Sequence, residues 1–199
     1  MTRASVVRAA RRQFLSAGYG ATTIGSIAAE AGVSTETIYK AFTNKPGLVR
    51  AIHEEALAGS GSVSAETRSD AMRDRVADPR EVIRNWAGFT SEVMPRVAPI
   101  LLLVRSGASS APALAALWDE LEERRLGRMA QHAAHFERRG DLRPDITRDQ
   151  ARDVLWAYTS PEFYERLVVQ QEWPLGRYSE FVAEGIIAAL LPPPLPQHR

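Results

Sequence analysis

The sequence predicts an all-α protein made of a small N-terminal three-helix module and a larger helical domain. Apolar residues recur at spacings of three and four along most of the chain, which is the period of an amphipathic helix. Helix start and stop signals flank these stretches, whereas strand-like alternation, internal repeats and glycine-rich phosphate loops are absent from the sequence. Packing helices on helices is then the architecture that buries the apolar stripes.

Four short helices are expected in the first 58 residues. Gly18 and Gly20 are predicted to end the first helix, and Gly32 is placed to close the second helix in a left-handed conformation. Ser34 and Asn44 are natural N-caps for the third and fourth helices. The apolar stripes of these helices consist of Val6, Val7, Ala10, Phe14, Ala17, Ile24, Ile27, Ala28, Ala31, Ile38, Phe42, Leu48, Val49, Ile52 and Ala56.

The middle of the chain is predicted to hold two long helical stretches. Residues 59–78 are Gly/Ser-rich and then charged, so they are interpreted as a connection with one short helix. Asp78 precedes a proline and starts the next helix, in which Pro95 and Pro99 are expected to cause a kink or a break. A long helix is predicted over residues 112–139, before a glycine.

The last helices are marked by capping signals. Thr147 and Gln150 form a capping-box pattern, and Ser160 before a proline predicts a restart within the same stretch. A final helix is expected to end before three prolines, and residues 192–199 are predicted to be a disordered tail.

Composition excludes several classes of protein. The chain has 199 residues, of which 45% are hydrophobic and 25% charged, which is ordinary for a globular chain and argues against disorder. It has no cysteine, so disulfide scaffolds, cysteine-bound zinc, Fe–S clusters and thiol catalysis are excluded. Uninterrupted apolar runs such as Ile100–Val104 are far below the roughly 18 residues typical of a membrane span. We therefore expect a soluble, cytoplasmic protein with no membrane partner.

Charge is distributed unevenly along the chain. Residues 1–50 hold seven basic and two acidic residues, a net charge of +5, whereas residues 51–199 hold 18 basic and 22 acidic residues, a net charge of −4. This asymmetry indicates an anion-binding N-terminal part on an acidic body, unless so small an excess arose by chance.

Residues 23–42 have the pattern of a helix-turn-helix. Gly32 allows a sharp reversal, and Val33 and Ile38 can pack beneath the turn and fix the angle between the helices. The second helix begins with small hydroxyl residues, so its N-terminus can approach phosphates closely. Its outward side chains are Thr35, Glu36, Thr37, Tyr39 and Lys40.

Residues 22–45 resemble the N-terminal DNA-binding domain of the TetR family of bacterial transcriptional regulators. The resemblance extends over about residues 2–57, including Phe14, Gly18 and Tyr19, and is carried by glycine, capping Ser, Thr, Tyr, Phe and Lys at fixed spacing. It implies a helix-turn-helix domain over residues 1–57 and an effector-binding and dimerisation domain over residues 58–191.

The resemblance also assigns roles to individual residues. Thr35, Glu36 and Lys40 would face base edges, with Glu36 able to accept from cytosine and Lys40 able to reach guanine. Two residues keep a structural alternative: Glu36 as a partner of the helix dipole, and Tyr39 as a half-buried packing residue. The expected phosphate contacts are Thr23, Ser34, Thr37, Tyr39 and Lys45.

An effector pocket in the body is the next expectation. Aromatic and apolar residues with a few polar side chains suit a small, mostly apolar or aromatic ligand, although any one of them could instead belong to a plain core. Arg125 could bind a ligand's polar end or pair at the surface, and His132 with His135 is interpreted as a solvated pair, not a metal site. No cofactor or metal is predicted. The predicted pocket residues are Trp86, Phe89, Thr90, Leu101, Trp118, Leu121, Arg125, Met129, Trp156, Thr159 and Phe163.

The C-terminal stretch mixes small and large apolar residues, as a two-fold helical interface requires, with intramolecular core as the alternative. The predicted homodimer residues are Phe163, Leu167, Tyr178, Phe181, Val182, Gly185, Ile186 and Ala189.

Together these features predict a ligand-responsive repressor that binds a palindromic double-stranded DNA operator as a homodimer and is released by a small-molecule effector. One alternative is a DNA-binding regulator with no effector, controlled by a protein partner or by abundance. A remote alternative is a helical enzyme, but the sequence contains no nucleophile–base motif and its four histidines form no constellation.

Overall fold

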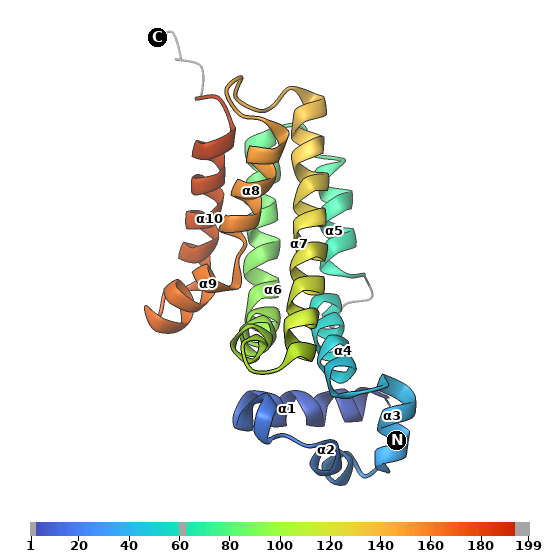
Figure 1. Cartoon of the computed structure of the whole chain (residues 1–199). Coiled ribbons are helices and arrows are strands. Elements are labelled where there is room, and N and C mark those ends of the chain that lie inside the picture. The colour runs from blue at the N-terminus through green and yellow to red at the C-terminus, as the bar shows by residue number, and fades with distance from the viewer. Residues whose placement is uncertain (1–2, 60–62, 194–199) are drawn as a thin grey trace, which may run out of the picture. The chain divides into compact units, whose positions relative to one another are not determined.

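The computed structural model describes residues 3–59 and 63–193, and the regular elements in these ranges are all helical, which confirms the all-α prediction (Figure 1). The elements are α1 (Arg3–Ala21), α2 (Ile24–Ala31), α3 (Thr35–Phe42), α4 (Lys45–Ala58), α5 (Ala65–Arg73), α6 (Pro79–Ala108), α7 (Pro112–Arg139), α8 (Arg148–Tyr158), α9 (Pro161–Tyr164), a π-helical turn η1 (Glu165–Gln170) and α10 (Leu175–Leu190).

The chain divides into two compact units. Unit 1 consists of residues 1–64 and 95–121, and unit 2 consists of residues 65–94 and 122–199. The chain therefore passes from one unit to the other inside α6 and again inside α7. The predicted division at residue 57 differs from this, because the first segment of unit 1 extends to residue 64 and residues 95–121 also group with the N-terminal helices.

In unit 1, α1 packs on α2 and α4, and α3 contacts both α2 and α4. The first three helices are the blue elements of Figure 1 and α4 is the cyan one. The predicted apolar stripes form this core: Phe14, Ile27 and Leu48 are fully buried. At about 25 cal/mol per Å² of apolar area, such burial is the main stabilising term for short helices that would be marginal alone.

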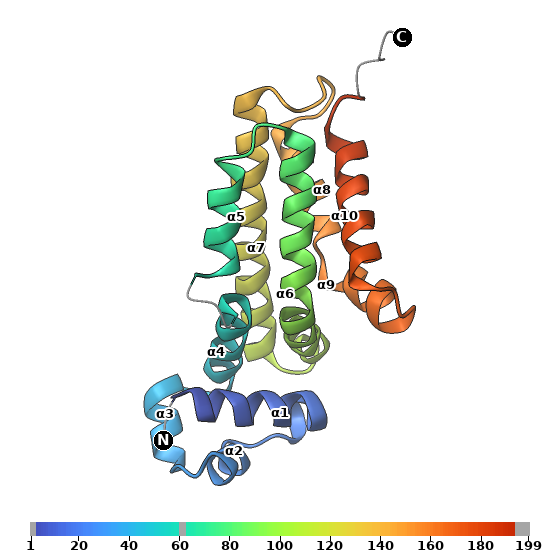
Figure 2. The same ribbon diagram turned by 180° about the vertical axis from the view of Figure 1, so that it is seen from behind.

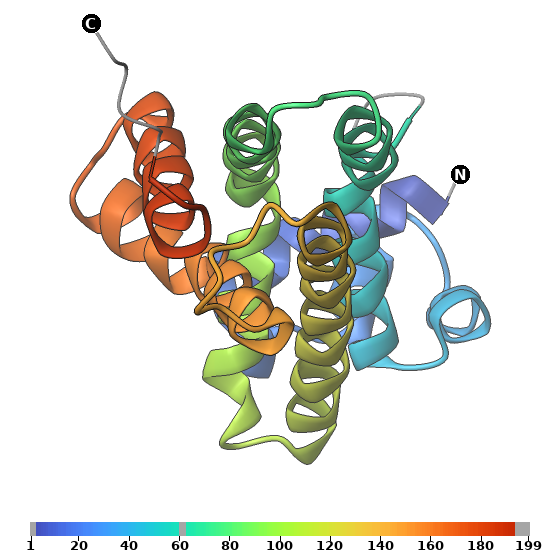
Figure 3. The ribbon, with the colours of Figure 1, turned by 90° about the horizontal axis from the view of Figure 1, so that it is seen from above.

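In unit 2, α10 lies beside α8 and also contacts η1, as the red and orange elements of Figure 3 show. Gln150 N donates a hydrogen bond to Thr147 Oγ1 and Thr147 N donates one to Gln150 Oε1, so the predicted capping box is present. Ser160 caps α9 at Phe163 N, which confirms the predicted restart. The short helix expected within residues 59–78 is α5 (Figure 2).

Glycine and proline shape α1 and α6. Gly18 is non-helical, with φ 82° and ψ 166°, so α1 is kinked where a glycine was predicted to end the first helix, and a short segment continues to Ala21. Pro95 and Pro99 lie inside α6, so of the kink or break expected there, the break is absent. A proline inside a helix costs about 3 kcal/mol, and the buried neighbours Val97 and Ile100 supply the packing that offsets this cost.

Among residues 3–59 and 63–193, α6 is also the helix long and apolar enough to cross a membrane by length and composition. Half of its most apolar stretch is buried, and core helices pass the same test, so this is weak evidence for a span. In the predicted tail, residues 194–199 lie outside the described residues.

Candidate nucleic-acid interface and effector region

The turn between α2 and α3 is built as the sequence predicts. Gly32 ends α2 with φ 65° and ψ 39°, and its N–H donates to the carbonyls of Ala28 and Ala29. Val33 N donates to Ala28 O at 3.0 Å, which completes the left-handed helix end. Ser34 then accepts from Thr37 N at 3.1 Å and starts α3. The two helices are thereby joined by a turn fixed at both ends.

Helix α3 separates an apolar face from a polar one. Ile38 and Phe42 are buried, whereas Tyr39 is 52% exposed. The packing alternative for Tyr39 is therefore not supported. The other predicted base and phosphate residues of this helix, Thr35, Glu36, Thr37 and Lys40, are exposed as well.

Two predicted phosphate ligands are also helix caps. Thr23 accepts from Ser26 N at 3.0 Å, and Ser34 Oγ lies 2.9 Å from Thr37 Oγ1. A hydroxyl group has one donor and two acceptor positions, so a cap that accepts from the main chain keeps its hydrogen for another acceptor. Capping and phosphate binding are thus compatible at Thr23.

Lys45 is placed differently from the other predicted phosphate ligands. Its Nζ donates to the main-chain carbonyl of Tyr19 and lies 4.1 Å from the centre of the Tyr19 ring. Partial burial lowers the pKa of Lys45. The ammonium group therefore rests on the end of α1 in this structure, and its predicted contact with phosphate stays a prediction.

A polar network holds α1 against α2, and the sequence gave no sign of it. Arg12 Nε donates to Glu30 at 3.0 Å, and Gln13 Nε2 donates to the other Glu30 oxygen at 2.5 Å. The hydrogen bonds from Gln13 and Arg12 lower the pKa of the Glu30 carboxyl. One N-terminal arginine thus serves the fold of the module.

Three further bonds tie the N-terminal helices to α6 and α7 within unit 1. Arg11 donates to Arg96 O at 3.2 Å, and Arg96 Nε donates to Ala56 O at 3.1 Å. Arg50 forms a two-pronged pair with Glu120, at 2.9 and 2.5 Å, which raises the pKa of Arg50. Since these partners lie 40 to 85 residues apart, no local pattern could have predicted them.

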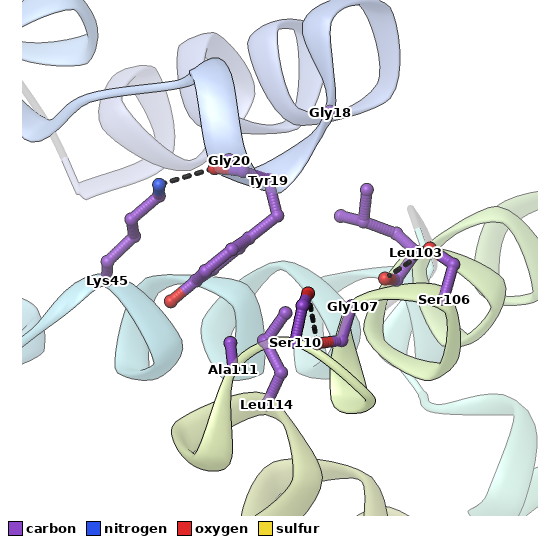
Figure 4. Close-up of a pocket in the computed structure, with 10 residues that line it drawn as sticks. All are labelled: Gly18, Tyr19, Gly20, Lys45, Leu103, Ser106, Gly107, Ser110, Ala111 and Leu114. Atoms are coloured by element: carbon purple, nitrogen blue, oxygen red, sulfur yellow. Dashed lines mark hydrogen bonds between the residues drawn. The ribbon is translucent and has the colours of Figure 1, made fainter.

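Unit 1 also contains a cavity of about 460 Å³. Its walls come from the end of α1, the first residue of α4, and the turn between α6 and α7 (Figure 4). The sequence-based prediction placed the pocket elsewhere, and this cavity was missed because its walls come from three separate parts of the chain. The lining residues are Gly18, Tyr19, Gly20, Lys45, Leu103, Ser106, Gly107, Ser110, Ala111 and Leu114.

Unit 2 brings together several of the predicted effector residues. Arg125 donates to Trp156 O at 2.7 Å and lies 4.9 Å from the Trp156 ring. Thr159 Oγ1 lies 3.7 Å from Met129 Sδ, and Glu122 holds Arg125 at 2.8 Å. Arg125 is mostly buried, so pairing at the surface is not its role.

The remaining predicted effector residues fall in two groups. Trp86 and Thr90 are buried in unit 2, where Phe89 and Phe163 are half-buried. Leu101, Trp118 and Leu121 belong to unit 1. The predicted set is therefore not a single cluster within one unit.

The interpretation of His132 as solvated is wrong. His132 is buried at 4% exposure, and its ring lies 4.5 Å from that of Trp86. Burial, with the charges of Arg128 and Arg73 nearby, lowers the pKa of His132 to about 3. His132 follows Met129 by three positions on α7, so its place on the apolar stripe was the signal that could have revealed it.

The predicted dimer residues need a similar correction. Tyr178, Val182 and Ile186 are fully buried within the single chain and belong to its core, where a second chain could not touch them. The space above Gly185 is filled by the Tyr158 ring of the same chain. Half-buried positions that keep some surface are Phe163, Leu167, Phe181 and Ala189.

Comparison with known proteins agrees with the helix-turn-helix geometry. Residues 6–52 match the family model described as bacterial regulatory proteins, tetR family. The curated relative YvkB from Bacillus subtilis, described as an uncharacterized HTH-type transcriptional regulator, is 37% identical over 73 residues. That match spans 37% of this chain and 39% of YvkB.

Solved structures match nearly the whole chain at low identity and so support the fold. The complex of SmeT with triclosan is 20% identical, with a TM-score of 0.72 over 98% of this chain and 99% of that one. NalD, the secondary repressor of the MexAB-OprM multidrug efflux pump in Pseudomonas aeruginosa, is 19% identical, with a TM-score of 0.71 over 95% of each chain. The family and relatives are transcriptional regulators and not enzymes. This chain therefore carries, at residues 6–52, the N-terminal domain of the tetR family of bacterial regulatory proteins, and it shares its fold with these solved structures.

Proposed function

We propose that this chain is a cytoplasmic, ligand-responsive repressor that binds a palindromic operator as a homodimer and leaves it when a small effector binds. The observation that carries this proposal is the exposed polar face of α3, presented on a turn fixed by Gly32 and Ser34. In such a motif the second helix enters the major groove, and base contacts from it give the sequence preference.

The proposed contacts divide by chemistry. Thr35, Glu36 and Lys40 take the base-edge role, because their exposed side chains carry donors and acceptors. The hydroxyl groups and the ammonium group of Lys45 take the phosphate role, which positions the helix but carries no sequence information. The proposed phosphate contacts are Thr23, Ser34, Thr37, Tyr39 and Lys45.

The effector is proposed to bind in the domain of residues 58–191 and to be uncharged and mostly apolar or aromatic. Two partly buried cations of unit 2 are already paired, Arg125 with Glu122 and Arg128 with Asp70. A charged ligand would have to break such a pair and bear its desolvation cost. That SmeT binds triclosan, an aromatic compound, supports the same ligand class.

Release follows from a population shift. A dimer holds two α3 helices at a separation that matches successive major grooves, about 34–36 Å. The effector must bind more tightly to a state in which the two α3 helices have a different separation, because a ligand can shift an equilibrium only by its difference in affinity for the two states. The pairs Arg50–Glu120 and Arg96–Ala56 tie α4 to α7 and α6 in unit 1, so they offer a route by which body helices reach the DNA-binding helices.

The experiment is selection of duplexes from a random library by the full chain, with light scattering of the same sample. We expect a two-fold symmetric site and a dimer. Triclosan is then added as the aromatic probe, and a rise in melting temperature with release of the duplex is expected. An enriched asymmetric site, or a monomer on DNA, would contradict the proposed assembly. Selection of a symmetric site without any response to aromatic compounds would favour the regulator that has no effector.

A further inference from the structure

The cavity of unit 1 is large enough for a ligand and lies at the DNA-binding helices. Its volume of about 460 Å³ falls within the roughly 300–1,000 Å³ of small-molecule sites. Gly18, Tyr19 and Gly20 line it from α1, and Lys45 from α4. It shares no residue with the effector set predicted for the body.

The lining is apolar on two sides. Figure 4 shows the Tyr19 ring facing the α6–α7 turn, where Leu103 and Leu114 project from the two helices. Gly107 keeps the turn closed, because a Cβ there would lie 2.3 Å from Leu114 Cδ1. An aromatic ring of a ligand would find aromatic and aliphatic contacts in this lining.

The polar part of the lining is one cation and two hydroxyl groups. Ser106 Oγ donates to Leu103 O at 3.0 Å and Ser110 Oγ donates to Gly107 O at 3.2 Å, both within their own turn. Hydroxyl groups rotate, so either can turn to donate to a ligand instead. Neither serine has a long-range partner to lose.

Lys45 is the feature that selects the ligand's charge. Its ammonium is bound to one carbonyl and one ring face, and within residues 3–59 and 63–193 no carboxylate forms an ion pair with it. Burial lowers the pKa of Lys45, so its charge is partly stripped of water without a compensating anion. An anion brought to Nζ would supply the missing counter-charge.

We propose that this cavity binds a compact aromatic carboxylate, with the carboxylate on Lys45 Nζ and the ring among the apolar lining residues. The site is separate from the effector site proposed in the body. Because Lys45 is also a proposed phosphate contact, the ligand and DNA would compete for one ammonium group, and this second part rests on the proposed function. An aromatic acid would thereby weaken DNA binding directly at the DNA-binding helices.

Benzoate and benzyl alcohol are the probes, because they share a ring and differ in charge. Calorimetric titration of the full chain at constant ionic strength should show one benzoate per chain, and benzyl alcohol should bind at least about tenfold more weakly, the value of one charged hydrogen bond. Equal affinity for the two probes would overturn the assignment to Lys45.

Two variants locate the site, each with a matched control. K45Q removes the charge, and S110F fills the cavity from an exposed position; both should reduce benzoate affinity at least about tenfold. The controls R8Q and S109F remove an exposed charge and add the same ring outside the lining, so both should bind benzoate like the wild type. Unchanged benzoate binding by folded S110F would place the ligand elsewhere, even if K45Q fails to fold.

Competition is tested with a 30-base-pair duplex of arbitrary sequence at low salt, where phosphate contacts dominate affinity. Benzoate should weaken duplex binding by the wild type and leave binding by S110F unchanged. If benzoate binds and the affinity for the duplex does not change, the proposed competition between ligand and DNA for Lys45 is wrong. Absence of duplex binding by the wild type would count against the proposed function, while the calorimetric result would still decide the carboxylate site.

Discussion

The rings of His132 and Trp86 lie 4.5 Å apart at a tilt of 55°, inside unit 2. Among the residues that the structure describes, none forms a hydrogen bond with His132 Nε2. Burial lowers the pKa of His132 most, and the nearby groups Arg128, Arg73 and His135 lower it further. Burial, the missing hydrogen bond and the nearby positive charges each make the imidazolium form of His132 less favourable than the neutral ring. The contact with Trp86 therefore depends on His132 staying uncharged.

This arrangement predicts a loss of stability in acid. The folded pKa of His132 is about 3, below the unfolded value near 6.5, so the unfolded chain binds the extra proton. The contribution of His132 to the free energy of unfolding is complete above about pH 6.5 and is lost as the pH falls toward 3. Between pH 7.5 and 5 the loss amounts to about 2 kcal/mol in the free energy of unfolding, measured by urea titration.

The variants H132F and H135Q separate this group from its neighbour. H132F keeps a ring against Trp86 and removes the titration, so the change in unfolding free energy between pH 7.5 and 5 should be smaller by about 2 kcal/mol than in the wild type. H135Q should keep most of the wild-type dependence, because His135 is only half-buried. Identical pH profiles for H132F and the wild type would show that His132 is hydrated or exposed in solution.

The turn of the helix-turn-helix gives a second prediction. Gly32 has φ 65°, so G32A forces a side chain into the left-handed region and should cost about 1–2 kcal/mol of unfolding free energy. G25A is the control on the same helix, at an exposed site with room for a Cβ, and it should be neutral or stabilising by up to about 1 kcal/mol. Denaturant unfolding of both variants checks this; equal stabilities would mean that the turn adapts without strain.

Local signals explain which parts of the fold were predictable. Thr147, Ser160 and Gly32 act through neighbours within three or four residues, so their caps follow from the sequence alone. The burial of His132 and the direction of Lys45 depend on partners across the fold. The grouping of residues 95–121 with the N-terminal helices depends on pairs such as Arg50 and Glu120, which are 70 residues apart.

The same distinction applies to the candidate site. The outward face of α3 follows from helical periodicity, since Ile38 and Phe42 define its buried side. Periodicity cannot tell one buried face from another, so the dimer prediction included Tyr178 and Val182, which pack inside the chain.

The outward face of α3 gives a third prediction, on DNA. Y39A should weaken binding to all duplexes alike, since Tyr39 is assigned to phosphate, by about tenfold at most. K40A should instead relax the preference at one base pair, with a cost of about 1–3 kcal/mol on the selected site only. Gel-shift titration across single-base operator variants distinguishes the two patterns, and a base-specific loss in Y39A would reverse the assignment.

The fourth prediction concerns Gly185 on α10, whose missing side chain makes room for Tyr158. A Cβ at Gly185 would lie 2.3 Å from Tyr158 Cε1, so G185A must displace a ring that also stacks on Phe163 at 5.7 Å. The expected cost is about 1–3 kcal/mol of unfolding free energy, typical of overpacking. G176A, on the same helix with no atom within 4 Å of its Cβ, is the control and should not be destabilised. Because the three nearest atoms all belong to the Tyr158 side chain, the double variant Y158L/G185A should lose less stability than the sum of the two single changes. Strict additivity would show that Tyr158 does not occupy this space.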